Sequence, residues 1–334
     1  MPVLRYASRW GLLRAAAAAV AILFAFGAGA QQPDWSSRAI SIVVPFPPGG
    51  ATDLVARILA QGLSPRLGQQ VLVENRPGAT GAVGSAYVAR ARPDGYTLVM
   101  GGVNTHAMIE AVHRNLPYAT LRDFAPVALT ANIPIAIVSH PSISAATLAD
   151  LIALARAQPG GLSYGSAGTG SPHHLAMELL KQAVGIDLVH VPYVGGAPQL
   201  TDLLAGRVQI GSIGVSTVLP HLGGHGRLRA LAVVSGRRAV ALPEVPTAAE
   251  AAGLPGFAVE YWLGLFAPAG TPEPLVRRLN AETNAVLGAP EVRDGLLRQG
   301  AEPATATVEG FARMVAEDVV RWAEVVRRGR LALD

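Results

Sequence analysis

The sequence has 334 residues, of which 50% are hydrophobic and only 15% charged, as in a globular protein large enough for two domains with apolar cores. This composition excludes a disordered or fibrous chain. No cysteine is present, which excludes disulfides, thiolate nucleophiles and cysteine metal sites. The formal net charge is +4, but residues 31–334 hold 24 basic and 23 acidic side chains, so we predict no nucleic-acid partner.

The N-terminus is predicted to be a secretory signal over residues 1–30. Arg5, Arg9 and Arg14 precede an apolar run at residues 15–26, and Ala28-Gly29-Ala30 fits a cleavage site made of small residues. The alternative is a retained membrane anchor, but about twelve apolar residues are fewer than the ~20 that span a bilayer. We therefore expect export and cleavage near Ala30.

Residues 40–100 alternate between predicted strands and helices. In the first helix, apolar residues recur at helical spacing and form one face that can lie on a sheet; they are Leu54, Val55, Ile58, Leu59 and Leu63. Such alternation indicates a parallel, doubly wound α/β sheet. The predicted strands are 40–44, 71–74 and 96–100, and the predicted helices are 53–67 and 81–91.

A second series of the same kind starts near Pro134. Its predicted strands are 135–139, 162–166, 188–191, 208–212 and 228–233, and its predicted helices are 148–157, 172–184, 197–205 and 215–222. Thr147 with Asp150 resembles a capping box, and Ser171-Pro172 places a cap before a first-turn proline. Lys181, the only lysine, falls where the helix should meet water, and a Schiff base would have to rest on it.

After Pro243 the regular alternation of predicted strands and helices ends, and a short apolar run follows at residues 264–267. Thr271-Pro272-Glu273 is predicted to open a helix with a cap, a proline and an acid, and Thr307 precedes a long helix. We interpret the apolar stripe of that last helix as core packing rather than a site for a partner helix; it consists of Val308, Phe311, Val315, Val319, Trp322 and Val326.

The two α/β series are connected by more than one segment of the chain. This organisation predicts two lobes with a cleft between them. We expect a discontinuous first lobe of residues 31–133 and 258–334, and a second lobe of residues 134–257. Ligands of open α/β sheets bind at the carboxyl ends of strands, and a cleft between domains is a favoured pocket. The ligand site is therefore expected between the lobes.

One turn is a good candidate for holding an anion. The strand that ends at Val44 is followed by Pro45-Phe46-Pro47-Pro48-Gly49-Gly50-Ala51-Thr52-Asp53, which opens a helix. The first N–H groups of a helix carry partial positive charge and accept a carboxylate or phosphate without a cation, and Gly49 and Gly50 allow a close approach. For this segment alone, a turn that only reverses the chain remains an equal alternative.

Three further strand-to-helix turns have similar chemistry. They are Asn75-Arg76-Pro77-Gly78-Ala79-Thr80-Gly81, Ser166-Ala167-Gly168-Thr169-Gly170-Ser171 and Tyr193-Val194-Gly195-Gly196. Each offers backbone donors and small hydroxyls at the carboxyl end of a predicted strand. Any one of them can be an ordinary loop, but four together favour a carboxylate site.

The two histidines after the Ser166–Ser171 turn do not form a metal set. Adjacent helix positions diverge by a quarter turn or more, and no i, i+4 partner or nearby carboxylate is expected to complete a metal set with His173 and His174. We predict no metal and no cofactor. A neutral imidazole that donates to a ligand fits better, because a helix N-terminus disfavours the charged form.

Enzyme signatures are missing where they would be expected. The sequence has no Gly-x-Ser-x-Gly around Ser166 or Ser171, no dinucleotide fingerprint and no Gly-Lys-Ser/Thr loop. This absence lowers the odds of catalysis without excluding it. We predict a binding protein without catalytic residues.

Together these motifs resemble those of a known family. Val44-Pro45-Phe46-Pro47-Pro48-Gly49-Gly50-Ala51-Thr52-Asp53, with Arg57 four residues on, is similar to the signature loop of the Bug family, the TctC-like extracytoplasmic solute receptors of tripartite tricarboxylate transporters. Further motifs follow in family order: Asn75-Arg76-Pro77-Gly78, Pro93-Asp94-Gly95-Tyr96-Thr97-Leu98, Phe124-Ala125-Pro126-Val127, Val191-Pro192-Tyr193, Leu242-Pro243-Glu244-Val245-Pro246-Thr247, Glu250-Ala251 and Ala267-Pro268-Ala269-Gly270-Thr271-Pro272. The similarity spans residues 38–330.

The resemblance implies a two-lobe α/β periplasmic binding protein of the type II-like class. Such a protein is a monomer that closes over a small carboxylate and delivers it to an integral membrane permease. Family members hold the ligand through loop amides, hydroxyls and water rather than a dedicated arginine. By position, the implied contacts are Phe46, Pro47, Gly49, Gly50, Ala51, Thr52 and Thr80 from the first lobe, and Ser166, Gly168, Thr169, Ser171, His174 and Tyr193 from the second. His174 matches the family's histidine before leucine, whereas His173 matches nothing.

One segment departs from the family pattern. Arg207-Val208-Gln209-Ile210-Gly211-Ser212-Ile213-Gly214 lacks the acid and the Asp-Asn pair of many relatives. An amino-acid ligand is therefore disfavoured, because its ammonium needs an acid. The expected ligand is a di- or tricarboxylate, or an aromatic or other organic acid.

Two alternative functions remain open at the level of sequence. One is an exported α/β enzyme that acts on a carboxylate with His174 as general base. The other is a sensory subunit that presents its liganded state to a membrane signalling partner.

Overall fold

The computed structural model describes residues 37–113, 115–223 and 227–329. The strands and helices below belong to one compact unit, Arg38–Asp334. The predicted signal at residues 1–30 lies outside the described residues. No helix in the described part of the chain combines the length and apolar character needed to cross a bilayer.

Six strands form the first sheet, in the order β11-β4-β10-β3-β1-β2. Strand β1 pairs in parallel with both β2 and β3, whereas β10 runs antiparallel to β3 and β4, and β11 antiparallel to β4. The bounds are β1 Ile40–Val44, β2 Val71–Asn75, β3 Thr97–Gly102, β4 Phe124–Asn132, β10 Trp262–Pro268 and β11 Glu302–Pro303.

Five strands form the second sheet, in the order β7-β6-β8-β5-β9. Strand β6 is parallel to β7 and β8, and β5 is antiparallel to β8 and β9. The bounds are β5 Ile135–Ser139, β6 Ser163–Ser166, β7 Val189–Pro192, β8 Ile210–Gly214 and β9 Arg229–Val233.

The parallel pairing predicted for the strands of residues 40–100 is confirmed, since β1 is parallel to β2 and β3, but it does not extend to all of the other strands. Both sheets are mixed, because the chain passes from the first sheet to the second through β4 and β5 and returns through β9 and β10. The strands at these crossings run against their neighbours. An apolar run predicts a buried strand but carries no information on its direction.

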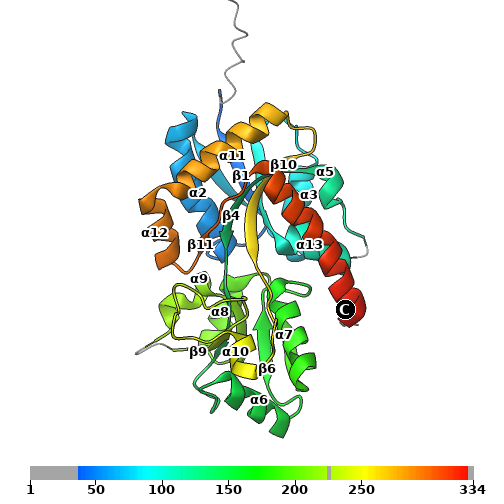
Figure 1. Ribbon diagram of the computed structural model, residues 1–334, viewed down its shortest axis with the longest axis vertical. Helices are drawn as coiled ribbons and strands as arrows, with labels where there is room; N and C mark the ends of the chain where they lie inside the picture. The colour runs from blue at the N-terminus through cyan, green and yellow to red at the C-terminus, as the bar shows by residue number, and fades with distance from the viewer. Residues whose placement is uncertain (1–36, 114, 224–226, 330–334) are drawn as a thin grey trace, which may run out of the picture. The chain divides into compact units, whose positions relative to one another are not determined.

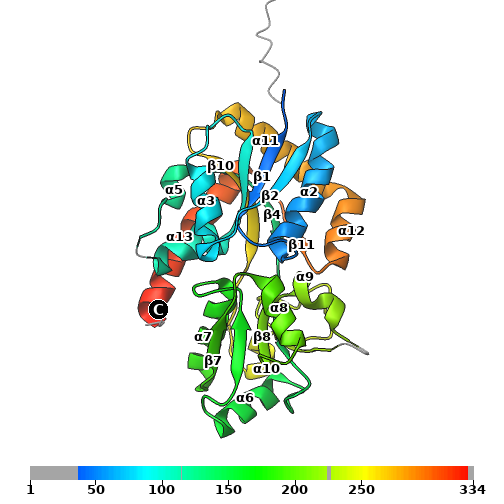
Figure 2. The same ribbon diagram turned by 180° about the vertical axis from the view of Figure 1, so that it is seen from behind.

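Helices cover both sheets (Figures 1 and 2). Helices α2 and α11 contact each other, α11 and α13 pack on β4, and α7 and α8 pack on β8. Around the first sheet lie α2 Ala51–Leu67, η1 Ala79–Gly81, α3 Ala82–Ala89, η2 Asn104–Met108, α4 Ile109–Val112, α5 Thr120–Asp123, α11 Glu273–Gly288, α12 Pro290–Arg298 and α13 Val308–Gly329. Around the second lie α6 Leu148–Ala157, α7 Pro172–Val184, α8 Gly196–Leu204, α9 Val215–Val218, η3 Leu219–His221 and α10 Ala248–Ala252.

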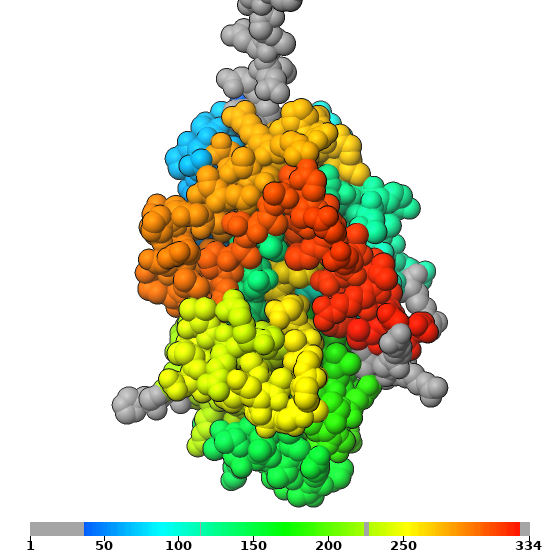
Figure 3. Space-filling view, in the orientation of Figure 1, coloured from blue at the N-terminus to red at the C-terminus, as the bar shows by residue number. Residues whose placement is uncertain are grey.

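The stripe on α13 packs into the core as predicted. Phe311, Val315 and Trp322 are buried, and the Phe311 ring lies 5.1 Å from that of Phe266 in β10. The opposite face of α13, red in Figure 3, lies at the surface, where Val320 is exposed. This helix therefore fixes the C-terminal segment on the first sheet.

Most predicted helix starts are confirmed. Thr147 and Asp150 form a capping box, and the Ser171 side chain accepts from the His174 N–H at the start of α7. The predicted cap at Thr271 is wrong, because its hydroxyl donates to the Pro268 carbonyl and the N-cap position is Pro272. A proline at that position supplies the extended entry to the helix but no side-chain acceptor.

Candidate functional site

The turn after β1 is held by a buried carboxylate. Asp53, in the first turn of α2, accepts from the Gly49 N–H and the Arg57 Nε, each at 3.0 Å, and from Asn75 Nδ2 at 2.9 Å. Asn75 Nδ2 also donates to the Phe46 carbonyl. Burial alone would raise the pKa of Asp53, but these hydrogen bonds outweigh it and lower the pKa below its ordinary value. The negative charge therefore fixes the turn from behind.

Two helix N-termini from different sheets line one small cavity, which we call the proximal pocket. Gly50 to Thr52 begin α2, and Gly195 to Ala197 begin α8. The N-cap residue of neither helix makes a side-chain capping bond. The cavity volume is about 30 Å³, and its wall consists of Phe46, Pro47, Gly50, Ala51, Thr52, Asn104, Ala167, His173, Gly195, Gly196, Ala197, Gly214, Thr217 and Tyr261. Two helix N-termini with partial positive charge meet at this cavity, and no acidic side chain is among its wall residues. The cavity therefore suits a small anion.

The polar side chains of the proximal pocket are neutral. The Thr52 and Tyr261 hydroxyls are 3.0 Å apart, and the His173 ring packs edge-on against the Tyr261 ring at 5.3 Å. Burial lowers the pKa of His173 to about 4 and raises that of Tyr261 to about 12. His173 Nδ1 is buried without a hydrogen-bond partner among the described residues, so it has capacity for a bond to a ligand or water.

A larger cavity, the distal pocket, shares Phe46, Ala167 and Gly195 with the proximal one. Its volume is about 260 Å³, and its wall consists of Phe46, Gly78, Ala79, Thr80, Gly81, Ala167, Gly168, Thr169, Pro192, Tyr193, Val194 and Gly195. The Thr80 hydroxyl donates to the Thr169 carbonyl across this pocket at 3.3 Å. The wall combines backbone, hydroxyl and apolar groups without a charged side chain.

The backbone at Ala79 and Thr80 is strained. Both residues have positive φ, 45° and 53°, a region that costs a β-branched residue such as Thr of order 1–3 kcal/mol. Thr80, one of the two strained residues, is also the one whose hydroxyl bonds to Thr169, in the turn that follows β6 of the second sheet.

The structure brings most of the predicted site residues together. Phe46, Pro47, Gly50, Ala51 and Thr52 line the proximal pocket. The distal pocket adds Thr80, Gly168, Thr169 and Tyr193 to Phe46. The Tyr193 hydroxyl donates to Asp202 at 2.9 Å, and burial together with this bond raises its pKa to about 12.

Four predicted residues lie outside both walls. Gly49 has a φ of 86° and its N–H donates to Asp53. Ser171 caps α7. Ser166 and His174 are buried behind the segment 167–170, where the Ser166 Oγ contacts His190 Nε2 and His174 Nδ1 accepts from the Gly170 N–H. A direct contact of these four with ligand stays a prediction.

Sequence reasoning missed several residues of the proximal pocket. His173, which matches no family position, lies in its wall, while its neighbour His174 does not. Asn104, Thr217 and Tyr261 also line it and come from segments without a predicted turn. Gly195 and Gly196 were not among the predicted contacts either, although they belong to a turn that the sequence had marked as a candidate because its glycines lead into a helix.

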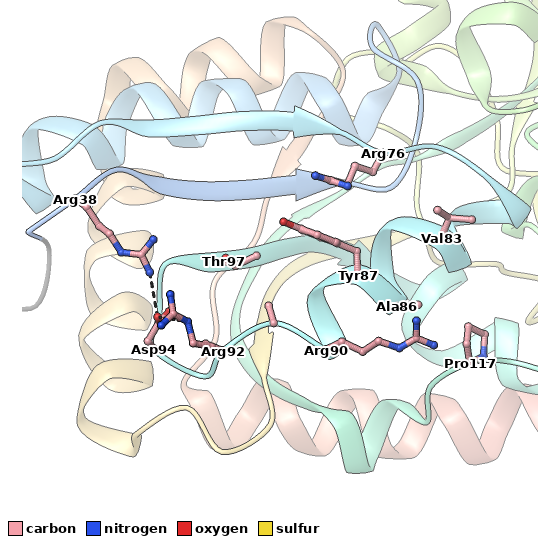
Figure 4. A pocket seen from close by; sticks show the side chains of 11 residues that line it. Arg38, Arg76, Val83, Ala86, Tyr87, Arg90, Arg92, Asp94, Thr97 and Pro117 are labelled. Carbon is pink, nitrogen blue, oxygen red and sulfur yellow. Dashed lines mark hydrogen bonds and ion pairs between the residues drawn. The ribbon is translucent and has the colours of Figure 1, made fainter.

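A third cavity is much larger but differs in kind (Figure 4). Its volume is about 730 Å³, and four arginines line it: Arg38, Arg76, Arg90 and Arg92. Arg38 bonds to Asp94 and stacks over Tyr96, and Arg76 stacks over Tyr87. All eleven lining residues lie between positions 38 and 117, in the part of the chain that builds the first sheet and its helices, so this open groove lacks the two-sided geometry of the other pockets.

Within residues 37–113, 115–223 and 227–329, no group of three or more His, Cys, Asp or Glu is placed to hold a metal ion.

Comparison with known proteins gives a consistent match. A family described as "Tripartite tricarboxylate transporter family receptor" matches residues 55–331. A UPF0065 protein of the tcbD-tcbE intergenic region of Pseudomonas sp. strain P51 is 42% identical over 304 residues, covering 90% of each chain. Protein BugT of Bordetella pertussis is 37% identical over 294 residues, covering 88% of this chain and 90% of BugT.

Two solved structures carry named ligands. R. palustris Rpa4515 with adipate is 36% identical, with a TM-score of 0.84 and coverage of 89% of this chain and 98% of that one. MatC from Rhodopseudomonas palustris with bound malate is 35% identical, with a TM-score of 0.80 and coverage of 87% and 99%.

Proposed function

Because this chain belongs to the tripartite tricarboxylate transporter receptor family, we propose that it binds a small organic acid between the two sheets, with a carboxylate in the proximal pocket. The observation that carries this proposal is the meeting of two helix N-termini, those of α2 and α8, at one cavity. Their free N–H groups stabilise a negative charge without a cation.

The ligands of the similar structures support the same chemistry. Adipate and malate, named in those two structures, are both carboxylates. The rest of the ligand would extend into the distal pocket, whose uncharged wall accepts apolar or hydroxylated carbon chains. The proposed contacts are Phe46, Pro47, Gly50, Ala51, Thr52, Thr80, Gly168, Thr169, Tyr193 and, in addition to the residues predicted from sequence, His173.

We also propose two lobes that close over the ligand. The first comprises residues 31–133 and 258–334, and the second residues 134–257. The membership of the two sheets supports this division, since β1–β4, β10 and β11 pair with one another and β5–β9 pair with one another. Closure would exclude water and strengthen the contacts with the carboxylate.

The family and its solved relatives are binding proteins, and we propose that this chain likewise performs no catalysis. His174, which the enzyme alternative needs as a base, already accepts a hydrogen bond through Nδ1 and lies outside both pocket walls. We further propose export by cleavage near Ala30, and transfer of ligand from a monomeric receptor to the integral membrane permease of a tripartite transporter.

A thermal-shift screen of the mature protein tests the proposal. Mono-, di- and tricarboxylates, including adipate and malate, and aromatic acids are added in a buffer without organic acids or phosphate. A ligand at one hundred times its dissociation constant stabilises the folded state by about 2.7 kcal/mol, so binders should raise the melting temperature with dose. If no acid shifts a folded, ligand-free sample, the proposal is overturned.

A pair of variants locates the site. Ala197→Asp places a carboxylate at the second residue of α8, in the wall of the proximal pocket. Asp favours a helix N-terminus, so the fold should persist while the ligand-induced shift is lost. Ala249→Asp makes the same change at the second residue of α10, outside both pocket walls, and should retain the shift.

A further inference from the structure

A buried polar cluster lies behind the cleft segment 166–171. His174, Glu178 and Lys181 are spaced at i, i+4 and i+7, so they share one face of α7. Their side chains are only 3%, 17% and 16% exposed. The prediction that Lys181 faces water is wrong, because its ammonium bonds to Glu178 at 2.9 Å. A long side chain on the flank of a helix can bend back to a buried carboxylate.

The cluster continues onto the neighbouring strands. Tyr164 of β6 donates its hydroxyl to Glu178 at 2.6 Å. The His190 ring of β7 stacks between Tyr164, at 5.0 Å, and His174, at 3.9 Å with an interplanar angle of 9°. His174 Nε2 lies 4.0 Å from the Glu178 carboxylate. Among the described residues these four, Tyr164, Glu178, Lys181 and His190, are the titratable groups that face His174.

Two hydrogen bonds connect the cluster to the wall of the distal pocket. His174 Nδ1 accepts from the Gly170 N–H at 3.1 Å. His190 Nε2 lies 2.7 Å from the Ser166 Oγ, which itself accepts from the Gly168 N–H. Gly168 and Thr169 form part of that wall. The imidazoles therefore hold both ends of the segment that faces the cleft.

This arrangement requires a neutral imidazole at His174. A proton on His174 Nδ1 would face the Gly170 N–H and abolish that bond, because protonated nitrogen cannot accept. It would also place a charge against His190 and near Lys181. Burial, opposed by Glu178 and assisted by Lys181, lowers the pKa of His174, and burial together with the facing His174 lowers that of His190 to about 4.

We propose that His174 is a positioning residue whose neutral imidazole, stacked on His190, holds Gly170 and the cleft-facing Gly168 and Thr169 in place, so that acid weakens ligand binding. This inference depends on the proposed function only in its prediction about ligand affinity. Both histidine pKa values lie below the ordinary value of 6.5. Affinity should therefore be constant at and above neutral pH and fall as the pH approaches about 4.

The first test needs no ligand. Hydrogen exchange is measured by mass spectrometry at pH 7 on the peptide that covers residues 166–171. His174→Ala removes the acceptor and should speed exchange there by about 3-fold or more, whereas His174→Asn can place an amide oxygen near the Nδ1 position and should stay close to wild type. Equal exchange in His174→Ala and wild type would overturn the positioning role, whether or not any acid binds.

The second test is the pH profile of adipate affinity by calorimetry from pH 7.5 to 4.0. Loss of one hydrogen bond predicts a 3- to 10-fold weaker affinity for His174→Ala at pH 7. His174→Asn should bind within about 3-fold of wild type and show a flatter profile. His140→Asn, at a histidine that bonds to Ser142 away from the cleft, should keep the wild-type profile.

The outcomes separate the two proposals. If His174→Asn loses affinity as much as His174→Ala while its exchange at residues 166–171 is normal, the imidazole contacts the ligand directly and the positioning role is wrong. If no acid binds at any pH, the proposed function fails, and the exchange result still decides the role of His174.

Discussion

Asp53 shows how one side chain can shape a site without lining it. Its carboxylate is 6% exposed and accepts from Gly49, Arg57 and Asn75. Helix α2 has no side-chain cap at Gly50, so the acid in its first turn takes that role by reaching back to Gly49. The N–H groups that follow remain available for a ligand.

We expect Asp53→Asn to destabilise the protein by about 1.5–3 kcal/mol at pH 7, because the hydrogen bonds lost are to a charged group. The native pKa of Asp53 is lowered from 3.8, so its contribution is complete above that ordinary value and is lost as the pH falls through the native pKa. Denaturant unfolding at pH 7 and pH 3 should show the difference from wild type shrinking in acid.

Asp94→Asn is the matched control. Asp94 pairs with Arg38 at the surface, where the two side chains are 35% and 54% exposed, and such pairs contribute about 0–1 kcal/mol. A loss in Asp53→Asn no larger than in Asp94→Asn would contradict the role given to the network.

At the scale of elements, β10 joins the two halves of the first sheet. It pairs with β3 on one side and β4 on the other, and α13 packs across it. Gly264 sits in the middle of β10, where an added Cβ would meet Phe311 Cε1 at 2.8 Å and the Ala128 carbonyl at 2.9 Å. The glycine therefore permits α13 to lie close to the sheet.

Gly264→Ala should destabilise the protein by about 1–3 kcal/mol, because neither a buried ring nor a strand carbonyl can move freely. Gly288→Ala, at the end of α11 with no atom within 4 Å of the new Cβ, should leave stability unchanged or raise it by about 0.4–1 kcal/mol. Denaturant unfolding of the two variants checks this. Similar losses in both would argue against close packing at Gly264.

Local patterns predicted the limits of many elements but not their partners. The strands at 40–44 and 135–139 and the helices at 148–157 and 172–184 have the predicted bounds, because periodicity and caps act within a few residues. Strand β4 and helix α12 were missed, and the direction of β10 relative to β3 was not predicted. These depend on contacts between distant segments, which a local pattern does not contain.

The same limit applies to the site. The Pro/Gly turn at residues 45–50 could be predicted to line the candidate site because its chemistry is local. Which of two adjacent histidines faces the cleft could not, since it depends on how α7 is rotated against β6 and β7. The structure turns His173 toward Tyr261 and His174 toward His190.

At the scale of the whole molecule, contacts between segments of the first sheet and segments of the second sheet can determine ligand affinity. The hydroxyl of Thr80, next to β2, reaches Thr169, next to β6. Glu302 of β11 accepts from Arg237 and from the Val240 N–H, which follow β9. In the two-lobe closure that we propose, a contact present only when the lobes are together stabilises the ligand-bound form by its own free energy.

Thr80→Ala should therefore weaken binding even though it removes only a hydroxyl and a methyl group. A net hydrogen bond contributes about 0.5–1.5 kcal/mol, which predicts a dissociation constant roughly 2- to 12-fold higher for whichever acid the thermal-shift screen identifies, expressed mainly in faster dissociation. Thr80→Ser keeps the hydroxyl and should bind like wild type, as measured by calorimetry and stopped-flow fluorescence. If Thr80→Ser is as weak as Thr80→Ala, the methyl packing or the strained backbone matters, and the bond to Thr169 does not hold the lobes together.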